Sequence, residues 1–119
     1  MSNNNYDDVL DEIRPSSDEI IKKKIRKIGF CRALVWVTIN LKRFGVVHAP
    51  ELAHFLKIDT SYAMRILREM EKLGLVKSMG TGIVEFVPTY EKGENDNVMV
   101  IEKFFDYALE KLRNMEVLG

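Results

Sequence analysis

The stretch from residue 57 to residue 77 gathers side chains whose types and spacing suit contacts to a polyanion. Arginine can donate two parallel hydrogen bonds to a guanine base, and lysine can place its charge against a phosphate. Lys57 and Lys77 flank the stretch and are candidates for contacts to a nucleic-acid backbone, with solvated lysines as the alternative. The candidate contact residues are Lys57, Thr60, Ser61, Tyr62, Met64, Arg65, Arg68, Lys72 and Lys77.

Within this set the residues differ in what they could contact. Arg65 suits a base contact, and the alternative is a surface salt bridge with Glu69. Arg68 and Lys72 lie further along and suit phosphates better than bases. Tyr62 could touch a base methyl group or a phosphate, or it could pack on a neighbouring helix. A base-reading role is therefore expected of Arg65 first.

Other kinds of site find little support in the residues. Ser61 and Ser78 lack a His–acid arrangement that the sequence can support, and Gly80-Thr81-Gly82 lies between two expected strands, so it is a turn and not a phosphate loop. His48 and His54 are six residues apart with no third ligand nearby, which favours a packing or surface role over a metal site. We expect a protein that is not an enzyme and has no cofactor or bound metal.

The contact residues need a particular set of elements to position them. Proline and glutamate open a short helix over about 49–57, and a turn at 58–60 leads into a second helix over about 60–73. Asp59 or Thr60 can cap that second helix. Gly74 stops it, and two β-prone runs, 75–79 and 83–87, form a hairpin. The inward side of the helix over about 60–73 is expected to carry Ala63, Ile66, Leu67, Met70 and Leu73.

Further helices flank this unit. A helix begins after Pro15 and carries the basic run 22–27, which is either a second backbone-contacting surface or, as we favour, a solvated face. A bend at Gly29 leads into a helix over about 30–43 that Gly45 closes. A short strand at 46–48, a polar acidic loop at 89–96 and an amphipathic helix over about 97–117 complete the expectation. The single cysteine, Cys31, is expected to be a small buried hydrophobe.

The charge of the chain is zero overall but unevenly distributed. Residues 1–19 carry a net charge of −5, residues 20–80 carry +9 and residues 81–119 carry −4. Phosphates respond to the local field and not to the chain average. A basic middle segment between acidic ends is therefore compatible with nucleic-acid binding.

At this point the sequence resembles a known family. Residues 61–76, SYAMRILREMEKLGLV, resemble the recognition helix and strand entry of winged helix-turn-helix regulators, and residues 49–53, APELA, resemble their preceding helix. The resemblance covers about residues 45–88, and the added terminal helices are similar to the MarR-type plan. It implies a mainly α protein with a small β-hairpin wing (α+β) that binds duplex DNA. The wing tip at residues 80–82 has no basic residue, unlike the usual pattern.

The last helix suggests an oligomer. Its apolar stripe exceeds what one small domain can readily cover, so we expect a homodimer, with folding back onto Leu34 and Trp36 as the alternative. The expected organisation is a flexible acidic terminus (1–14), a winged helix-turn-helix domain (15–96) and a dimerisation helix (97–119). The dimerisation residues are expected to be Ile101, Phe104, Phe105, Ala108, Leu109 and Leu112.

The residues leave two other functions open. Winged helices also serve as protein-interaction modules, and a DNA-organising protein with little sequence preference would carry the same basic surface. No signal peptide or membrane-spanning run is visible in the sequence, so a cytoplasmic, soluble protein without a membrane partner is expected.

Overall fold

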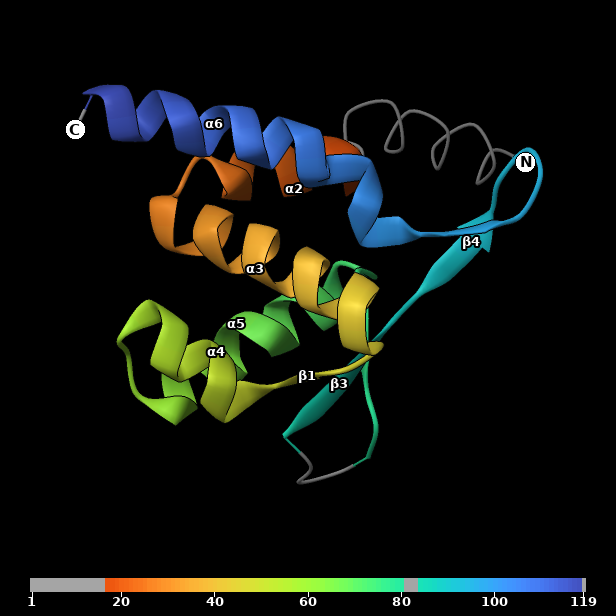
Figure 1. Cartoon of the computed structure of the whole chain (residues 1–119), viewed down its shortest axis with the longest axis horizontal. Coiled ribbons are helices and arrows are strands. Elements are labelled where there is room, and N and C mark those ends of the chain that lie inside the picture. The colour runs from red at the N-terminus through yellow and green to blue at the C-terminus, as the bar shows by residue number, and fades with distance from the viewer. Residues whose placement is uncertain (1–16, 81–83, 119) are drawn as a thin grey trace, which may run out of the picture.

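The computed structural model describes residues 17–80 and 84–118, which form a mostly helical α+β fold with two small antiparallel sheets. α3 (Ile28–Phe44) lies in the middle of the helices. α6 (Phe105–Leu118) runs along one side of α3, and α4 (Ala49–Leu56) and α5 (Thr60–Lys72) lie on the other (Figure 1). α2 (Ser17–Ile25) packs against both α3 and α6. The predicted flexible terminus, residues 1–14, lies outside the described residues.

α3 is buried on most of its circumference because helices cover it from both sides. Its end is defined by Gly45, whose φ of +76° is readily adopted only by glycine and whose N–H donates to the Leu41 carbonyl at 2.9 Å. Cys31 is fully buried, and its thiol donates to the Ala108 carbonyl of α6 at 3.1 Å. The prediction of a buried cysteine is therefore confirmed. The buried residues of α3 are Phe30, Cys31, Ala33, Leu34, Val35, Val37, Thr38 and Leu41.

The break between the first two described helices lies earlier than the predicted bend at Gly29. α2 ends at Ile25, and Lys27 has an extended backbone (φ −84°, ψ 124°). Gly29 lies inside α3. The bend falls where exposed basic residues join two buried segments, so packing of Ile25 and Phe30 into the core fixes it more than glycine does.

A three-stranded antiparallel sheet closes one edge of the helices. β1 (Val47–His48) and β2 (Val76–Ser78) both pair with β3 (Glu85–Pro88), in the order β1-β3-β2. Phe86 of β3 pairs with Val47 of β1 and is completely buried. The predicted short strand and the two hairpin strands are confirmed, whereas the turn at 80–82 falls largely outside the described residues.

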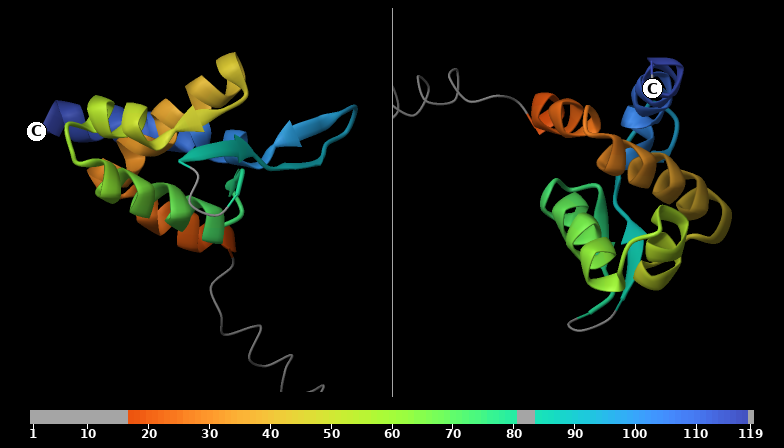
Figure 2. Two further views of the ribbon diagram at one scale, coloured as in Figure 1. Left: turned by 90° about the horizontal axis from the view of Figure 1, so that it is seen from below. Right: turned by 90° about the vertical axis from the view of Figure 1, so that its left-hand side faces the viewer.

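The segment after this sheet differs from the prediction. Instead of a loop at 89–96 followed by a helix from residue 97, β4 (Tyr90–Lys92) and β5 (Asn97–Met99) form a second hairpin. A 3₁₀ helix, η1 (Val100–Phe104), then leads into α6. Figures 1 and 2 show this hairpin extending beyond the helices. The last α-helix therefore begins at Phe105, eight residues later than expected.

The apolar stripe of the last segment is largely covered by the chain itself. Ile101, Phe104 and Ala108, three of the residues predicted to form the dimer, are 0%, 2% and 0% exposed. Ile101 and Phe104 lie on η1 and Ala108 lies on α6, and all three belong to the core that these elements share with α3. Phe105, Leu109 and Leu112 are half-buried. The premise that one domain cannot cover this stripe is therefore wrong for the first three residues, and the alternative of folding back within the chain describes them. Leu34 is buried in the same core, whereas Trp36 stacks on Phe55 of α4, with 5.8 Å between the ring centroids.

Candidate nucleic-acid interface

α5 has a buried side and an exposed basic side. Ala63, Ile66, Leu67 and Met70 face the core. Residues three and four apart on a helix lie on the same face. The opposite side therefore presents a single exposed row, which we call the α5 row: Ser61, Arg65, Arg68 and Lys72.

The N-terminus of α5 is fixed by its capping residue. The Asp59 carboxylate accepts the Tyr62 N–H at 2.8 Å and the Ser61 hydroxyl at 2.9 Å. These two hydrogen bonds, the backbone one first, lower the pKa of Asp59. Of the two predicted caps, Asp59 is the one that forms. The hydroxyl proton of Ser61 is committed to this cap, which leaves its oxygen as an acceptor for a ligand.

Tyr62 and Arg65 lie together on the exposed surface. Tyr62 is 53% exposed, which contradicts the alternative that it packs on a neighbouring helix. The Arg65 guanidinium lies over the Tyr62 ring, 5.8 Å from its centroid. Glu69, the alternative partner of Arg65, instead forms an ion pair with Lys24 of α2. The stacked ring narrows the orientations open to Arg65 while its donors remain accessible.

The other predicted contact residues surround this row. Lys57 ends α4 with a left-handed backbone (φ 59°) and is exposed, as is Thr60 at the start of α5. Met64 is half-buried beside the row. Lys77 is exposed on β2. Arg68 and Lys72 line a groove with Lys24, Arg65, Glu69 and Leu73, so the structure adds a residue of α2 to the predicted set.

The first hairpin is attached to α5 by a carboxylate that carries no recognisable signal in the sequence. Glu71 accepts both the backbone N–H of Ser78, at 2.8 Å, and its hydroxyl, at 2.9 Å. These bonds lower the pKa of Glu71, the backbone bond most strongly. The hairpin is thereby held beside the last turn of α5.

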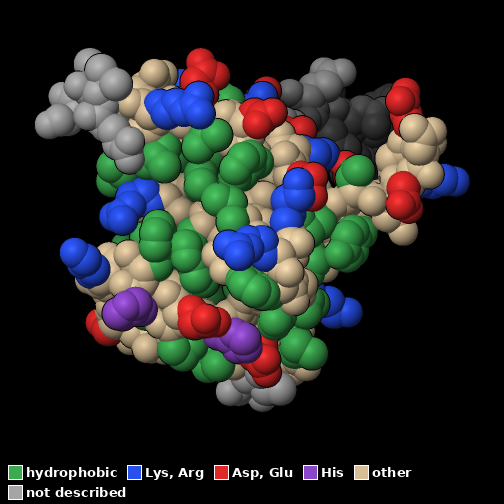
Figure 3. All heavy atoms as spheres, in the orientation of Figure 1, with side chains coloured by type: hydrophobic (Ala, Val, Ile, Leu, Met, Phe, Trp, Pro, Cys, Tyr) green, Lys and Arg blue, Asp and Glu red, His purple; other side chains and the backbone are tan. Residues whose placement is uncertain are grey.

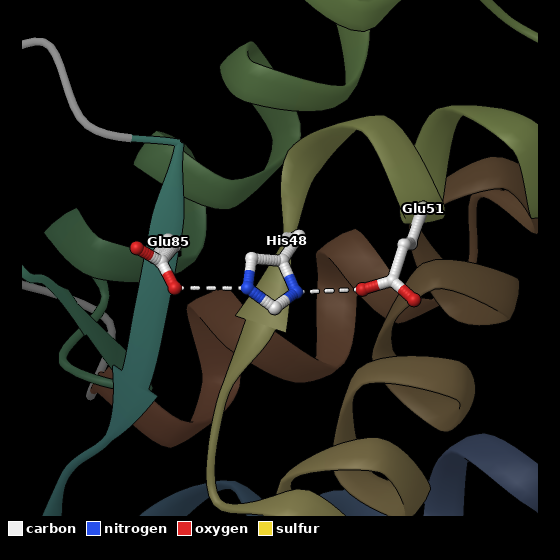
Figure 4. Close-up of polar contacts among 3 residues, drawn as sticks. All are labelled: His48, Glu51 and Glu85. Atoms are coloured by element: carbon white, nitrogen blue, oxygen red, sulfur yellow. Dashed lines mark hydrogen bonds and ion pairs between the residues drawn. The ribbon is translucent and has the colours of Figure 1, made fainter.

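His48 attaches the same hairpin to α4. Its Nδ1 lies 2.6 Å from Glu51 Oε1, and its Nε2 lies 2.8 Å from Glu85 Oε2 (Figure 4). The hydrogen bonds to Glu51 and then Glu85 raise the pKa of His48. Each ring nitrogen faces a different carboxylate, so the imidazole joins β3 to the start of α4.

This bridge predicts a pH-dependent contribution to stability. Because the folded state raises the pKa of His48, the contribution is fully present below about pH 6.5, the ordinary histidine pKa, and is lost as pH rises through the raised value. We expect His48→Gln to lower the thermal midpoint more at about pH 6 than at about pH 9. His54→Gln, which removes the chain's other histidine, is the control. An equal loss at both pH values would contradict the bridge.

The described residues contain neither a metal cluster nor a membrane span. No group of three or more His, Cys, Asp or Glu side chains within residues 17–80 and 84–118 is placed to hold a metal ion. No helix in this part of the chain has the length and apolar character needed to cross a membrane.

Comparison with known proteins found no family model, no curated protein and no solved structure that matches this chain.

Proposed function

We propose that this protein is a winged helix-turn-helix DNA-binding protein that acts as a transcriptional regulator. The observation that carries the proposal is the α5 row, an exposed row of polar and basic residues on a helix whose opposite side is buried. A helix with its side chains is about 10–12 Å wide, and the major groove of B-DNA is about 12 Å wide. α5 can therefore enter the groove with this row toward the bases.

The surrounding elements support the same proposal. α4 and α5 are joined by a turn of only residues 57–59. β1 precedes α4, β2 and β3 follow α5, and the three strands form a sheet of order β1-β3-β2. In a helix-turn-helix the second helix lies in the major groove, while the first helix crosses the DNA backbone. The element order α3-β1-α4-α5-β2-β3 supports a winged helix in which β2 and β3 would be the wing.

The test uses two duplexes in a gel-shift experiment at low salt. One contains the DNA upstream of the protein's own gene, and the other is a random duplex of the same length. Tighter binding to the first supports a sequence-specific regulator. Equal binding to both would replace it with a DNA-organising role, and binding to neither would reject DNA as the ligand and favour a protein-interaction module.

We also propose that the protein is a homodimer. A groove between α3 and the η1–α6 segment is lined by the apolar Ile39 and Phe105, by basic Lys42 and Arg43 and by acidic Glu102 and Asp106, with Thr38. Within the chain Lys42 lies 3.8 Å from Glu102. Ile39 is 41% exposed. In a two-fold interface a patch meets its own copy, so a patch with both signs of charge around apolar residues complements itself. In the view of Figure 3, exposed hydrophobic side chains lie beside basic and acidic ones.

A substitution at this interface is expected to change the oligomeric state of the protein. We expect Ile39→Asp to convert a dimer into a 13.8 kDa monomer, because a carboxylate would be buried against apolar groups of the partner. Phe44→Asp is the matched control, because Phe44 is 64% exposed on the same helix and does not line the groove. Sedimentation at micromolar concentration measures both. A monomeric wild-type chain would contradict the dimer, and a dimeric Ile39→Asp would contradict this interface.

A further inference from the structure

We propose that α2 is a second DNA-contacting element, in which Lys23, Lys24 and Lys27 bind backbone phosphates on the side of α5 opposite the hairpin. This inference rests on the proposed DNA-binding function and specifies how that surface is completed. It also reverses the expectation that the lysine-rich run is only a solvated face.

The two sides of α5 are identified by its two interacting carboxylates. Glu71 holds the hairpin through Ser78, whereas Glu69 pairs with Lys24 of α2. Residues two apart on an α-helix point about 200° away from each other. The hairpin and α2 therefore flank α5 on opposite sides, with the α5 row between them. In the right-hand view of Figure 2, α2 and α5 lie on the same side of the molecule.

The basic residues of α2 do not all face the same way. Ile21 and Ile25 are buried. Lys22 lies over the Tyr107 ring of α6, 5.4 Å from its centroid, whereas Lys24 pairs with Glu69 of α5. One edge of the buried stripe of α2 therefore faces α6, and the opposite edge faces α5.

Lys23 and Lys27 lie next to Lys24 on the exposed surface of α2 and of the residues that follow it. They line a groove together with Lys24, Ile20 and the acidic Glu19. Lys24 also lines the groove that holds the exposed Arg65, Arg68 and Lys72. The two grooves therefore share Lys24, and we call the exposed residues that line them the α2–α5 surface.

The charge on the two flanks of α5 is unequal. The described residues of β2 and β3 contain one basic side chain, Lys77, and one acidic side chain, Glu85. The α2 flank offers Lys23, Lys24 and Lys27, with Glu69 and Glu19 beside them. A helix in the major groove has a phosphate backbone on both sides, and phosphate contacts fix its register. The α2 flank is the better placed to supply those contacts.

The test compares two double variants that remove the same charge. Lys23→Gln/Lys27→Gln neutralises the α2–α5 surface. Lys22→Gln/Lys111→Gln is the control, because both of its lysines lie over the Tyr107 ring, at 5.4 and 5.3 Å. Fluorescence anisotropy measures the Kd for the duplex that the wild-type chain prefers and for a random duplex, each over a salt titration.

Phosphate contacts carry no sequence information, so we expect Lys23→Gln/Lys27→Gln to weaken binding to both duplexes by the same factor, about tenfold at 0.1 M salt. The slope of log K against log salt should flatten by about 0.9 for each phosphate that the variant no longer neutralises. The control should stay within about twofold of wild type, since its lysines face away from the surface. Equal behaviour of the two variants, while the wild-type chain binds DNA, would overturn the α2 proposal alone. Failure of the wild-type chain to bind either duplex at low salt would overturn the proposed function with it.

Discussion

Binding of this protein to a DNA duplex is expected to weaken steeply as salt concentration rises, although its formal net charge is zero. The cause is local, because the phosphates meet residues 20–80, which carry a net charge of +9. Each neutralised phosphate releases condensed counterions and contributes about −0.9 to the slope of log K against log salt. Five exposed basic residues are the first contributors in each protomer, and a dimer doubles them: Lys57, Arg65, Arg68, Lys72 and Lys77. Since not all of them will touch phosphate, we expect a slope of roughly −4 to −8 for the dimer.

The expected effect is large and simple to measure. A slope of about −4 corresponds to a loss of roughly 250-fold in affinity between 50 and 200 mM salt. A chain without residues 1–14, which contain four acidic residues and one basic residue, should bind as tightly as the full chain or more tightly. A slope near zero, or no binding at low salt, would reject the DNA proposal.

The pair of helices α4 and α5 is predictable almost to the residue because its signals are local. The inward residues of α5 repeat at helical spacing, Asp59 supplies the cap, and Gly74 provides the positive φ (+80°) that follows the helix. α5 ends at Lys72, one residue before the prediction. Caps, glycine and periodicity act within a few residues, so the sequence alone indicates them.

The second hairpin could not be predicted in the same way. The apolar spacing of Val98, Ile101 and Phe105 fits a helix as well as it fits a strand followed by a 3₁₀ turn. The choice is made by partners elsewhere in the chain. Tyr90 pairs with Met99, and the Val100 N–H donates to the Thr89 carbonyl at 2.9 Å. Tertiary pairing overrides local helical spacing here.

The role of the last helix is hard to predict for a related reason. An apolar stripe indicates that something covers it, but not whether the cover is another part of the chain or a second copy. α3 covers Ile101, Phe104 and Ala108, which leaves the groove around Ile39 and Phe105 as the surface for the proposed dimer. The sequence carries no signal that would decide this before the helices are placed.

In the candidate site, the contact residues could be predicted from their residue types, whereas the residues that hold the elements of the site together could not. The Lys24–Glu69 pair joins positions 45 residues apart, and Glu71 binds Ser78 across the end of α5. A charged residue on a helix surface has many possible partners in sequence. Only the placement of α2 beside α5 shows which pair forms, and thereby which lysines face the proposed DNA.

Arg65→Ala is expected to remove sequence discrimination while leaving the fold intact. Arg65 is exposed on the first half of α5, and its guanidinium lies 5.8 Å from the centroid of the Tyr62 ring. A bidentate arginine–guanine contact is worth about 1–3 kcal/mol of discrimination against the wrong base. The ratio of Kd values for random and preferred duplexes should therefore fall by about 5- to 150-fold. Arg32→Ala is the matched control, because Arg32 lies over an aromatic ring in the same way, 5.3 Å from the Phe55 centroid, but on α3.

Arg65→Lys separates the base contact from the charge. Lysine keeps the positive charge but lacks the planar pair of donors that matches a guanine edge. We therefore expect Arg65→Lys to lose most of the discrimination that Arg65→Ala loses, yet to keep the wild-type salt slope, since the phosphates still meet the same net charge. The measurement is the same pair of duplexes titrated over salt. If both variants retain the wild-type ratio of Kd values, Arg65 does not contact a base. If both lose affinity equally for the two duplexes, Arg65 is a phosphate contact and the specificity must come from its neighbours on α5.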